Sequence, residues 1–123
     1  MILVGVFLGG AAGAALRGLV YFLVSRLRWD DLPVATSAVN VAGAFLLGSL
    51  TGLALSHDLS AAWMAFWGGG FCGALTTFST WQNNLLSLAE AKRWRDFSVH
   101  VVVDLIAGIG AVAMGLEIGR IYG

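Results

Sequence analysis

The sequence predicts an all-α membrane protein of four transmembrane helices, the third of which is broken at its centre. Of the 123 residues, 59% are hydrophobic and 11% are charged, whereas soluble domains carry about 25% charged residues. Four apolar stretches are long enough to cross a bilayer, which takes about 20 residues for a hydrocarbon core of ~30 Å. Only the third stretch is crowded with glycine and hydroxyl residues. The formal net charge is zero, which argues against a nucleic-acid partner.

The elements follow one another with short polar connectors. We expect helices at about 2–24, 34–56, 62–89 and 97–119. Pro33 is the only proline and stands where the second helix should begin, a place where its missing N–H costs little. A cleaved signal peptide is the alternative for the first stretch, but no Lys or Arg precedes Arg17, and such a peptide needs a positive start. We therefore expect a retained first helix and a single bundle over 1–123.

Small residues predict where the helices pack against one another. Lipid supplies no hydrophobic drive between helices, so small side chains that let backbones approach closely mark the contacts. The glycines expected at such contacts are Gly9, Gly13, Gly43, Gly48, Gly108 and Gly115. Four helices of this length enclose little volume, so we expect an aqueous pathway to need a second subunit.

The stretch Gly68 to Asn84 predicts the break in the third helix. Four glycines in it each cost roughly 0.8–1 kcal/mol against alanine in a helix interior. Four hydroxyl residues then surround Phe78 within five positions. Irregular backbone at membrane depth is tolerated only where protein or a water-filled cavity satisfies its polar groups. We therefore interpret this stretch as polar groups turned toward something small that crosses the bilayer.

Polar residues inside the other spans are further functional candidates. Asn40 lies deep in an apolar helix and offers two neutral N–H donors; an interhelical hydrogen bond is its alternative role. Arg17 either extends toward the headgroups or has a structural or vestibule role. His100 and Asp104 are one turn apart and could satisfy each other. Cys72 is the only cysteine, which excludes an intrachain disulfide, and we expect it to be a small buried apolar residue.

Three segments together resemble the CrcB/Fluc fluoride channels. The segments are Gly9–Arg17 (GGAAGAALR), Thr36–Gly48 with Val39-Asn40 inside it, and Gly70–Thr80 (GFCGALTTFST). The resemblance covers all four spans in order, and the third string is specific. It implies small four-helix subunits that assemble as antiparallel dimers with two fluoride pores. It also implies a central sodium ion and passive export of fluoride across the cell membrane, with a multi-pass location.

The residue chemistry suits fluoride independently. A pore must replace the hydration shell of this small anion with donors that do not hold it too firmly. The Asn40 amide and the hydroxyls of Thr36, Ser79 and Thr80 can donate. An aromatic ring has a positive edge, so an edge-on Phe78 can touch an anion while excluding water. By resemblance, Asn40 and Phe78 occupy pore-lining positions.

The resemblance also places a sodium ion at the helix break. Where the helical hydrogen-bond ladder is interrupted, carbonyl oxygens lose their partners and can turn to a hard cation. By resemblance these are the main-chain oxygens of Gly73 and Thr76, and a two-fold axis would supply the same pair from a second subunit.

Several positions depart from the family pattern. Trp81 stands where the family usually has a second phenylalanine; its indole keeps a positive edge and adds an N–H donor. Asn84 stands in place of a glutamate, and Ala74 in place of a glycine. Gly108 and Val112 align with hydroxyl residues of the family's polar track. If that alignment holds, this chain supplies only part of a normal pore.

The charges of the connectors predict one orientation. Five basic residues lie in the first and third connectors and only Arg120 lies on the other side, which predicts both termini outside the cell. A chain with such a bias cannot form an antiparallel homodimer unless it inserts both ways. The partner is therefore either a second copy or a homologue of opposite orientation, and the bias favours the homologue.

Two further functions remain as alternatives. One is a non-conducting or auxiliary subunit that stabilises a conducting partner. The other is a small multidrug-type transporter, a class that needs a carboxylate in the first helix, where residues 2–24 contain none. The sequence does not predict an enzyme, because no nucleophile–base pair or metal-ligand cluster converges in it.

Overall fold

The computed structural model describes residues 2–26, 34–56, 60–76 and 78–122. Over these ranges every regular element is a helix, as predicted. Three helices are long and apolar enough to span a membrane, over Ile2–Arg26, Ala35–Leu55 and Trp94–Ile121. The predicted helix start at Pro33 and most of the connectors 25–33 and 57–61 lie outside the described residues.

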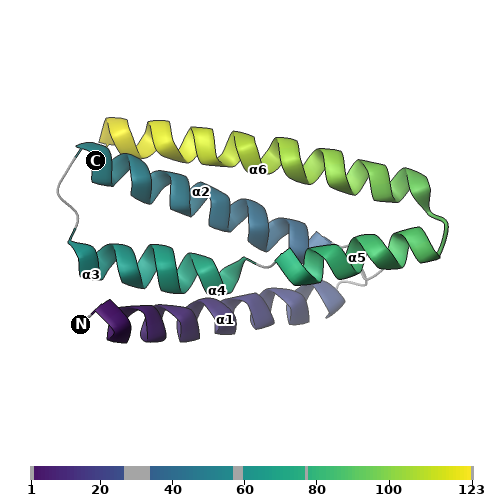
Figure 1. The fold of residues 1–123 in the computed structure, drawn as a ribbon, viewed down its shortest axis with the longest axis horizontal. Helices are drawn as coiled ribbons and strands as arrows, with labels where there is room; N and C mark the ends of the chain where they lie inside the picture. Colours follow the sequence, from purple (N-terminus) through teal and green to yellow (C-terminus); the bar gives the residue numbers. More distant parts are fainter. Residues whose placement is uncertain (1, 27–33, 57–59, 77, 123) are drawn as a thin grey trace.

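The helices form an elongated bundle whose third span is divided. The elements are α1 (Ile2–Arg26), α2 (Val34–Ser56), α3 (Ala61–Met64), η1 (Ala65–Cys72), α4 (Gly73–Leu75), α5 (Phe78–Glu90) and α6 (Trp94–Tyr122). Figure 1 shows α1 beside α3 and α4, α2 beside α6, and α5 continuing beyond the break toward the start of α6. The third predicted helix is therefore one bent span, built from α3, η1, α4 and α5.

Glycines set the closeness of α2 and α6. A Cβ added at Gly48 would fall on the carbonyl oxygen of Val112, and one at Gly115 would fall on that of Phe45. Gly52 and Gly119 repeat this relation one turn further along their helices. Backbones therefore touch directly along this pair. The prediction for Gly108 is wrong within this chain, because a Cβ there would meet no atom within 4 Å.

The glycine-rich part of the third span is a π-helix, which the sequence reasoning did not predict. In η1 the turns are wider than in an α-helix. The carbonyls of Phe66 and Phe71, five residues apart, face Gly9 and Gly13 of α1, four residues apart. One wide turn of η1 thus matches one ordinary turn of α1. Gly68, Gly69 and Gly70 lie within this wider helix, and the break itself falls later, at Thr76.

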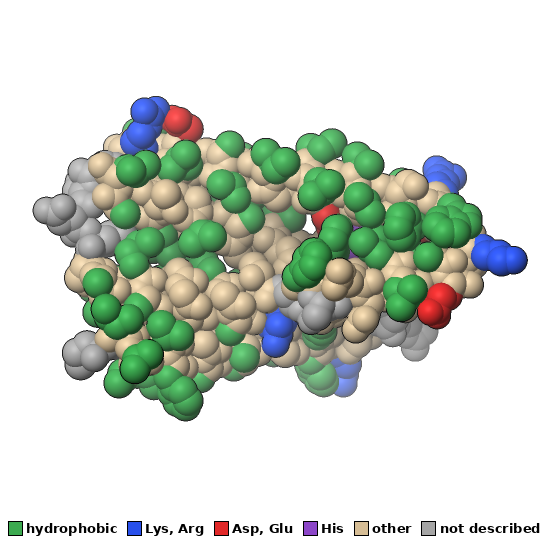
Figure 2. All heavy atoms as spheres, in the orientation of Figure 1, with side chains coloured by type: hydrophobic (Ala, Val, Ile, Leu, Met, Phe, Trp, Pro, Cys, Tyr) green, Lys and Arg blue, Asp and Glu red, His purple; other side chains and the backbone are tan. Residues whose placement is uncertain are grey.

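The surface of the bundle is largely apolar. Long side chains such as Leu3 and Ile106 are exposed, whereas Val39 is the largest fully buried side chain. Figure 2 shows hydrophobic side chains along this face, charged side chains at its two ends, and a few further charged groups near its middle. An apolar exterior with charged ends is what a bilayer requires.

Candidate functional site

A groove of about 420 Å³ opens beside the break in the third span. It brings together four of the predicted site residues, Asn40 from α2 and Gly73, Thr76 and Phe78 from the broken span. The other lining residues are Gly43, Ala44, Leu47, Gly68, Cys72 and Val112. None of these residues is charged. The described part of the chain also holds no cluster of three His, Cys, Asp or Glu that could bind a metal.

Thr76 marks the point where the helix breaks. Its backbone is extended, with φ −82° and ψ 156°, directly after the last helical residue of α4, Leu75. Its hydroxyl donates to the carbonyl oxygen of Cys72 at 2.9 Å, and its methyl group faces Gly43. The extended backbone takes the main-chain oxygen of Thr76 out of the helical hydrogen-bond pattern, so this oxygen is available to a cation. The neighbouring Thr77 lies outside the described residues.

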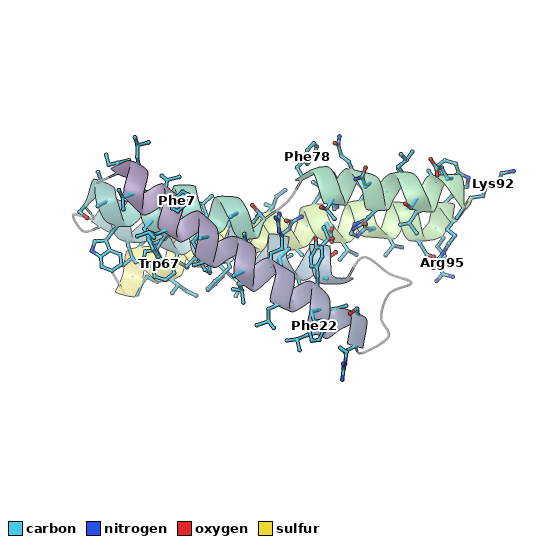
Figure 3. All side chains as sticks on the ribbon, turned by 90° about the horizontal axis from the view of Figure 1, so that it is seen from below. Phe7, Phe22, Trp67, Phe78, Lys92 and Arg95 are labelled. Carbon is cyan, nitrogen blue, oxygen red and sulfur yellow. The ribbon has the colours of Figure 1, made fainter. Side chains whose placement is uncertain are left out.

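Phe78 begins α5 and projects outward from it. Its side chain is 66% exposed in the single chain. Figure 3 shows the labelled ring standing clear of the first turn of α5. Its centroid lies 5.7 Å from that of Trp81, with the two rings tilted by 33°. Thr80 is half-buried, and the side chain of Ser79 lies outside the description.

The hydroxyl of Thr36 joins three helices. Thr36 on α2 is 2% exposed. Its Oγ1 accepts a hydrogen bond from Nδ2 of Asn84 on α5 at 2.9 Å, and lies 2.9 Å from the hydroxyl of Tyr21 on α1. Thr36 and Asn84, noted separately in the sequence, therefore form one unit. Tyr21 was missed, although its position one turn after Arg17 on the same helix was a signal.

A second polar cluster lies between α2, α5 and α6. Nδ1 of His100 lies 3.3 Å from Oδ2 of Asp104, which confirms that these two side chains satisfy each other. The same carboxylate oxygen accepts the indole N–H of Trp81 at 2.9 Å. Ser37 Oγ lies 3.4 Å from His100 Nδ1. The indole N–H of Trp81 is therefore bound to a carboxylate of its own chain.

The remaining candidates lie at the margins of these clusters. Val112 lines the groove, whereas Gly108 is not among the lining residues. Arg17 is half-buried on α1 and forms no ion pair with a residue in the described ranges. Cys72 is 3% exposed, in keeping with a small buried side chain.

Comparisons with known proteins cover nearly the whole chain. A family model described as CrcB-like protein, Camphor Resistance (CrcB), matches residues 4–116. A protein of Mycobacterium tuberculosis named fluoride-specific ion channel FluC 2 is 42% identical over 118 residues, covering 96% of this chain and 90% of that protein. The fluoride-specific ion channel FluC of Thermococcus onnurineus is 36% identical over 122 residues, covering 97% of this chain and 96% of its own length. The fluoride-specific ion channel FluC of Azobacteroides pseudotrichonymphae is 36% identical over 114 residues, covering 92% of this chain and 90% of that protein.

Proposed function

Since the chain belongs to the CrcB family of membrane proteins, we propose that it is a subunit of a fluoride-selective channel and not an enzyme. It is a multi-pass membrane protein, and its task would be the passive exit of fluoride down its gradient. The observation that carries this proposal is the groove beside Thr76. It places an amide donor, Asn40, and an aromatic ring, Phe78, on one uncharged surface at the helix break.

The chemistry of the groove supports a small anion as the permeating species. A neutral amide donates hydrogen bonds without the charge that would trap an anion. The positive edge of an aromatic ring attracts an anion weakly, while its carbon skeleton excludes bulk water. Conduction needs binding that is strong enough to strip water and weak enough to release the ion. Asn40 and Phe78 meet both conditions better than a lysine or an arginine would.

A sodium ion at the break is the second part of the proposal. The main-chain oxygens of Gly73 and Thr76 would bind it, because the extended backbone at Thr76 turns its carbonyl out of the helical ladder. Two oxygens are too few for a hard cation, so the same pair from a second subunit would complete the site. The absence of charged residues from the groove lining is consistent with a monovalent ion.

The proposed assembly is an antiparallel dimer. Phe78 is 66% exposed in the single chain, and a ring that lines a pore must be covered on its other side. The partner is a second copy or an oppositely oriented homologue.

An auxiliary, non-conducting role is the second candidate function. Val112 presents an apolar surface to the groove, and the Trp81 N–H is already donated to Asp104. Both features reduce the donors that this chain can supply to an anion.

Fluoride efflux from liposomes that contain only this purified chain distinguishes the two functions. A conducting subunit releases fluoride and retains chloride in matched vesicles. An auxiliary subunit releases neither until an oppositely oriented homologue is added. Release of chloride at the same rate as fluoride would contradict the proposed selectivity.

A further inference from the structure

A carboxylate holds Trp81, whose ring neighbours that of Phe78 in the groove lining. Asp104 is 10% exposed at its side chain and His100 is 6% exposed. Oδ2 of Asp104 accepts the Trp81 indole N–H at 2.9 Å and lies 3.3 Å from His100 Nδ1. The Trp81 ring also lies 6.1 Å from the His100 ring and 5.7 Å from the Phe78 ring, centroid to centroid. Trp81 thus lies next to both Phe78 and the His100–Asp104 pair.

The donors and acceptors assign the roles in this cluster. An indole N–H can only donate, so it donates to Oδ2 of Asp104. Nδ1 of His100 lies 3.3 Å from the same oxygen and 3.4 Å from Ser37 Oγ. His100 Nε2 is buried and has no partner among the described residues, which suits a bare nitrogen and disfavours a second N–H there. The Asp104 oxygen therefore accepts the indole N–H of Trp81, with the His100 imidazole beside it.

We propose that Asp104 is a positioning residue of the ion pathway, which holds the indole N–H of Trp81 away from the permeating anion. The ring then offers its carbon edge beside Phe78, as a phenylalanine would. A free indole N–H would instead donate a hydrogen bond to fluoride and slow its release, because bonds to charged acceptors are stronger than neutral ones. His100 keeps the carboxylate in place. This inference rests on the proposed function, since it assigns residues to the same pathway.

A double-mutant cycle tests the proposal by fluoride efflux from liposomes. Asp104→Leu removes the acceptor, so we expect flux to fall by about tenfold, the size of one charged hydrogen bond. In the Trp81→Phe background no N–H remains to be freed, so Asp104→Leu should change flux by about twofold or less. Asp104→Asn keeps an accepting oxygen and should retain most of the flux. The control Glu117→Gln removes an exposed carboxylate of the same helix, paired with Arg120, and should leave flux unchanged.

Indole N–H resonances in detergent give a readout that does not depend on conduction. The Trp81 signal is the one lost in Trp81→Phe, and it should shift toward the position of a free indole in Asp104→Leu while the other indole signals stay. Asp104→Asn should move it partway, which keeps the test decisive if the leucine variant does not fold. An unmoved Trp81 signal in Asp104→Asn, or an equal loss of flux on Asp104→Leu in both backgrounds, overturns the proposal. If the unaltered chain passes no fluoride, the proposed function is wrong. The indole N–H resonance of Trp81 then still tests whether Asp104 holds that N–H.

Discussion

At the scale of single residues, Thr36 shows how one hydroxyl connects three helices. Its oxygen receives the Asn84 amide and contacts the Tyr21 hydroxyl in a site that is 2% exposed. We expect Thr36→Val to lower the free energy of unfolding by about 1–3 kcal/mol, because it leaves two polar partners unsatisfied at nearly constant volume. Thr36→Ser keeps the oxygen and should cost less. Thermal unfolding in detergent measures both, and equal midpoints for the two variants would contradict this assignment.

A second prediction for a single residue concerns Phe78 and the conduction of fluoride. Phe78→Ile removes the positive ring edge from the groove, so we expect fluoride flux to fall by about tenfold or more, which corresponds to ~1.4 kcal/mol in the barrier. Dimer assembly should be nearly unchanged. The matched control is Phe7→Ile on α1, another exposed phenylalanine that does not line the groove. Unchanged flux in a folded Phe78→Ile protein would remove Phe78 from the pathway.

Sequence reasoning identified several of these residues but not their partners. The resemblance singled out Asn40 and Phe78 for the pore and Gly73 and Thr76 for a cation, and the structure brings all four to one groove. The pairing of Trp81 with Asp104 was not predicted. These residues lie on different helices, and their contact depends on how α5 tilts after the break, which no local pattern determines. The His100–Asp104 pair was predictable because its spacing of four residues is local.

At the scale of elements, glycines decide which helices can touch. A Cβ at Gly9 would fall on the carbonyl oxygen of Phe66, whereas one at Gly18 on the same helix would meet nothing within 4 Å. We expect Gly9→Ala to lower stability by about 1–3 kcal/mol, since backbone must move to admit it. Gly18→Ala should raise stability by up to about 1 kcal/mol through helix propensity. Unfolding midpoints that change in the same direction would show that α1 does not approach η1 this closely.

The third span shows which features of a helix the sequence can predict and which it cannot. Glycine and hydroxyl content predicted a break within Gly68–Asn84, and the chain does leave the helix at Thr76, but the pattern did not predict that the backbone at Gly68–Gly70 stays helical with wider turns. That widening matches five residues of η1 to four of α1, and so it depends on the neighbouring helix. Helix propensity describes each residue by itself, so it cannot predict a change of helix type that depends on a neighbouring helix.

The proposed sodium site yields a prediction at the same scale. A Cβ at Gly73 has room within the chain, its nearest atom being the Gly68 oxygen at 4.0 Å. Gly73→Val should therefore fold, yet its side chain would stand in the groove and displace the ion. Thr76→Ser keeps both the main-chain oxygen and the hydroxyl, and should retain sodium. Sodium that stays with the purified protein after desalting, measured by atomic emission, checks both; equal sodium in the two variants would contradict the site.

At the scale of the whole molecule, charge is gathered at the ends. Lys92 and Arg93 lie between α5 and α6, and Arg95 lies in the first turn of α6. Figure 3 shows Lys92 and Arg95 at the far end of that helix pair. Arg120 at the opposite end is paired with Glu117. Basic residues near the membrane resist translocation, so this end should stay in the cytoplasm. The distribution predicts one dominant orientation for the chain.

That orientation decides the composition of the proposed dimer. An antiparallel homodimer needs both orientations in one membrane, whereas a heterodimer needs only one from this chain. We expect single cysteines at Ala61 and Ala91, both exposed and at opposite ends, to be labelled from opposite sides of the membrane in cells that express this chain alone. The native Cys72 is buried, so the unaltered chain gives the background. The charge distribution places both termini outside, and Ala61 lies at the same end of the bundle as the termini. Ala61→Cys should therefore react only from outside, and Ala91→Cys only from the cytoplasm. Comparable labelling of each cysteine from both sides would show dual insertion and support the homodimer instead.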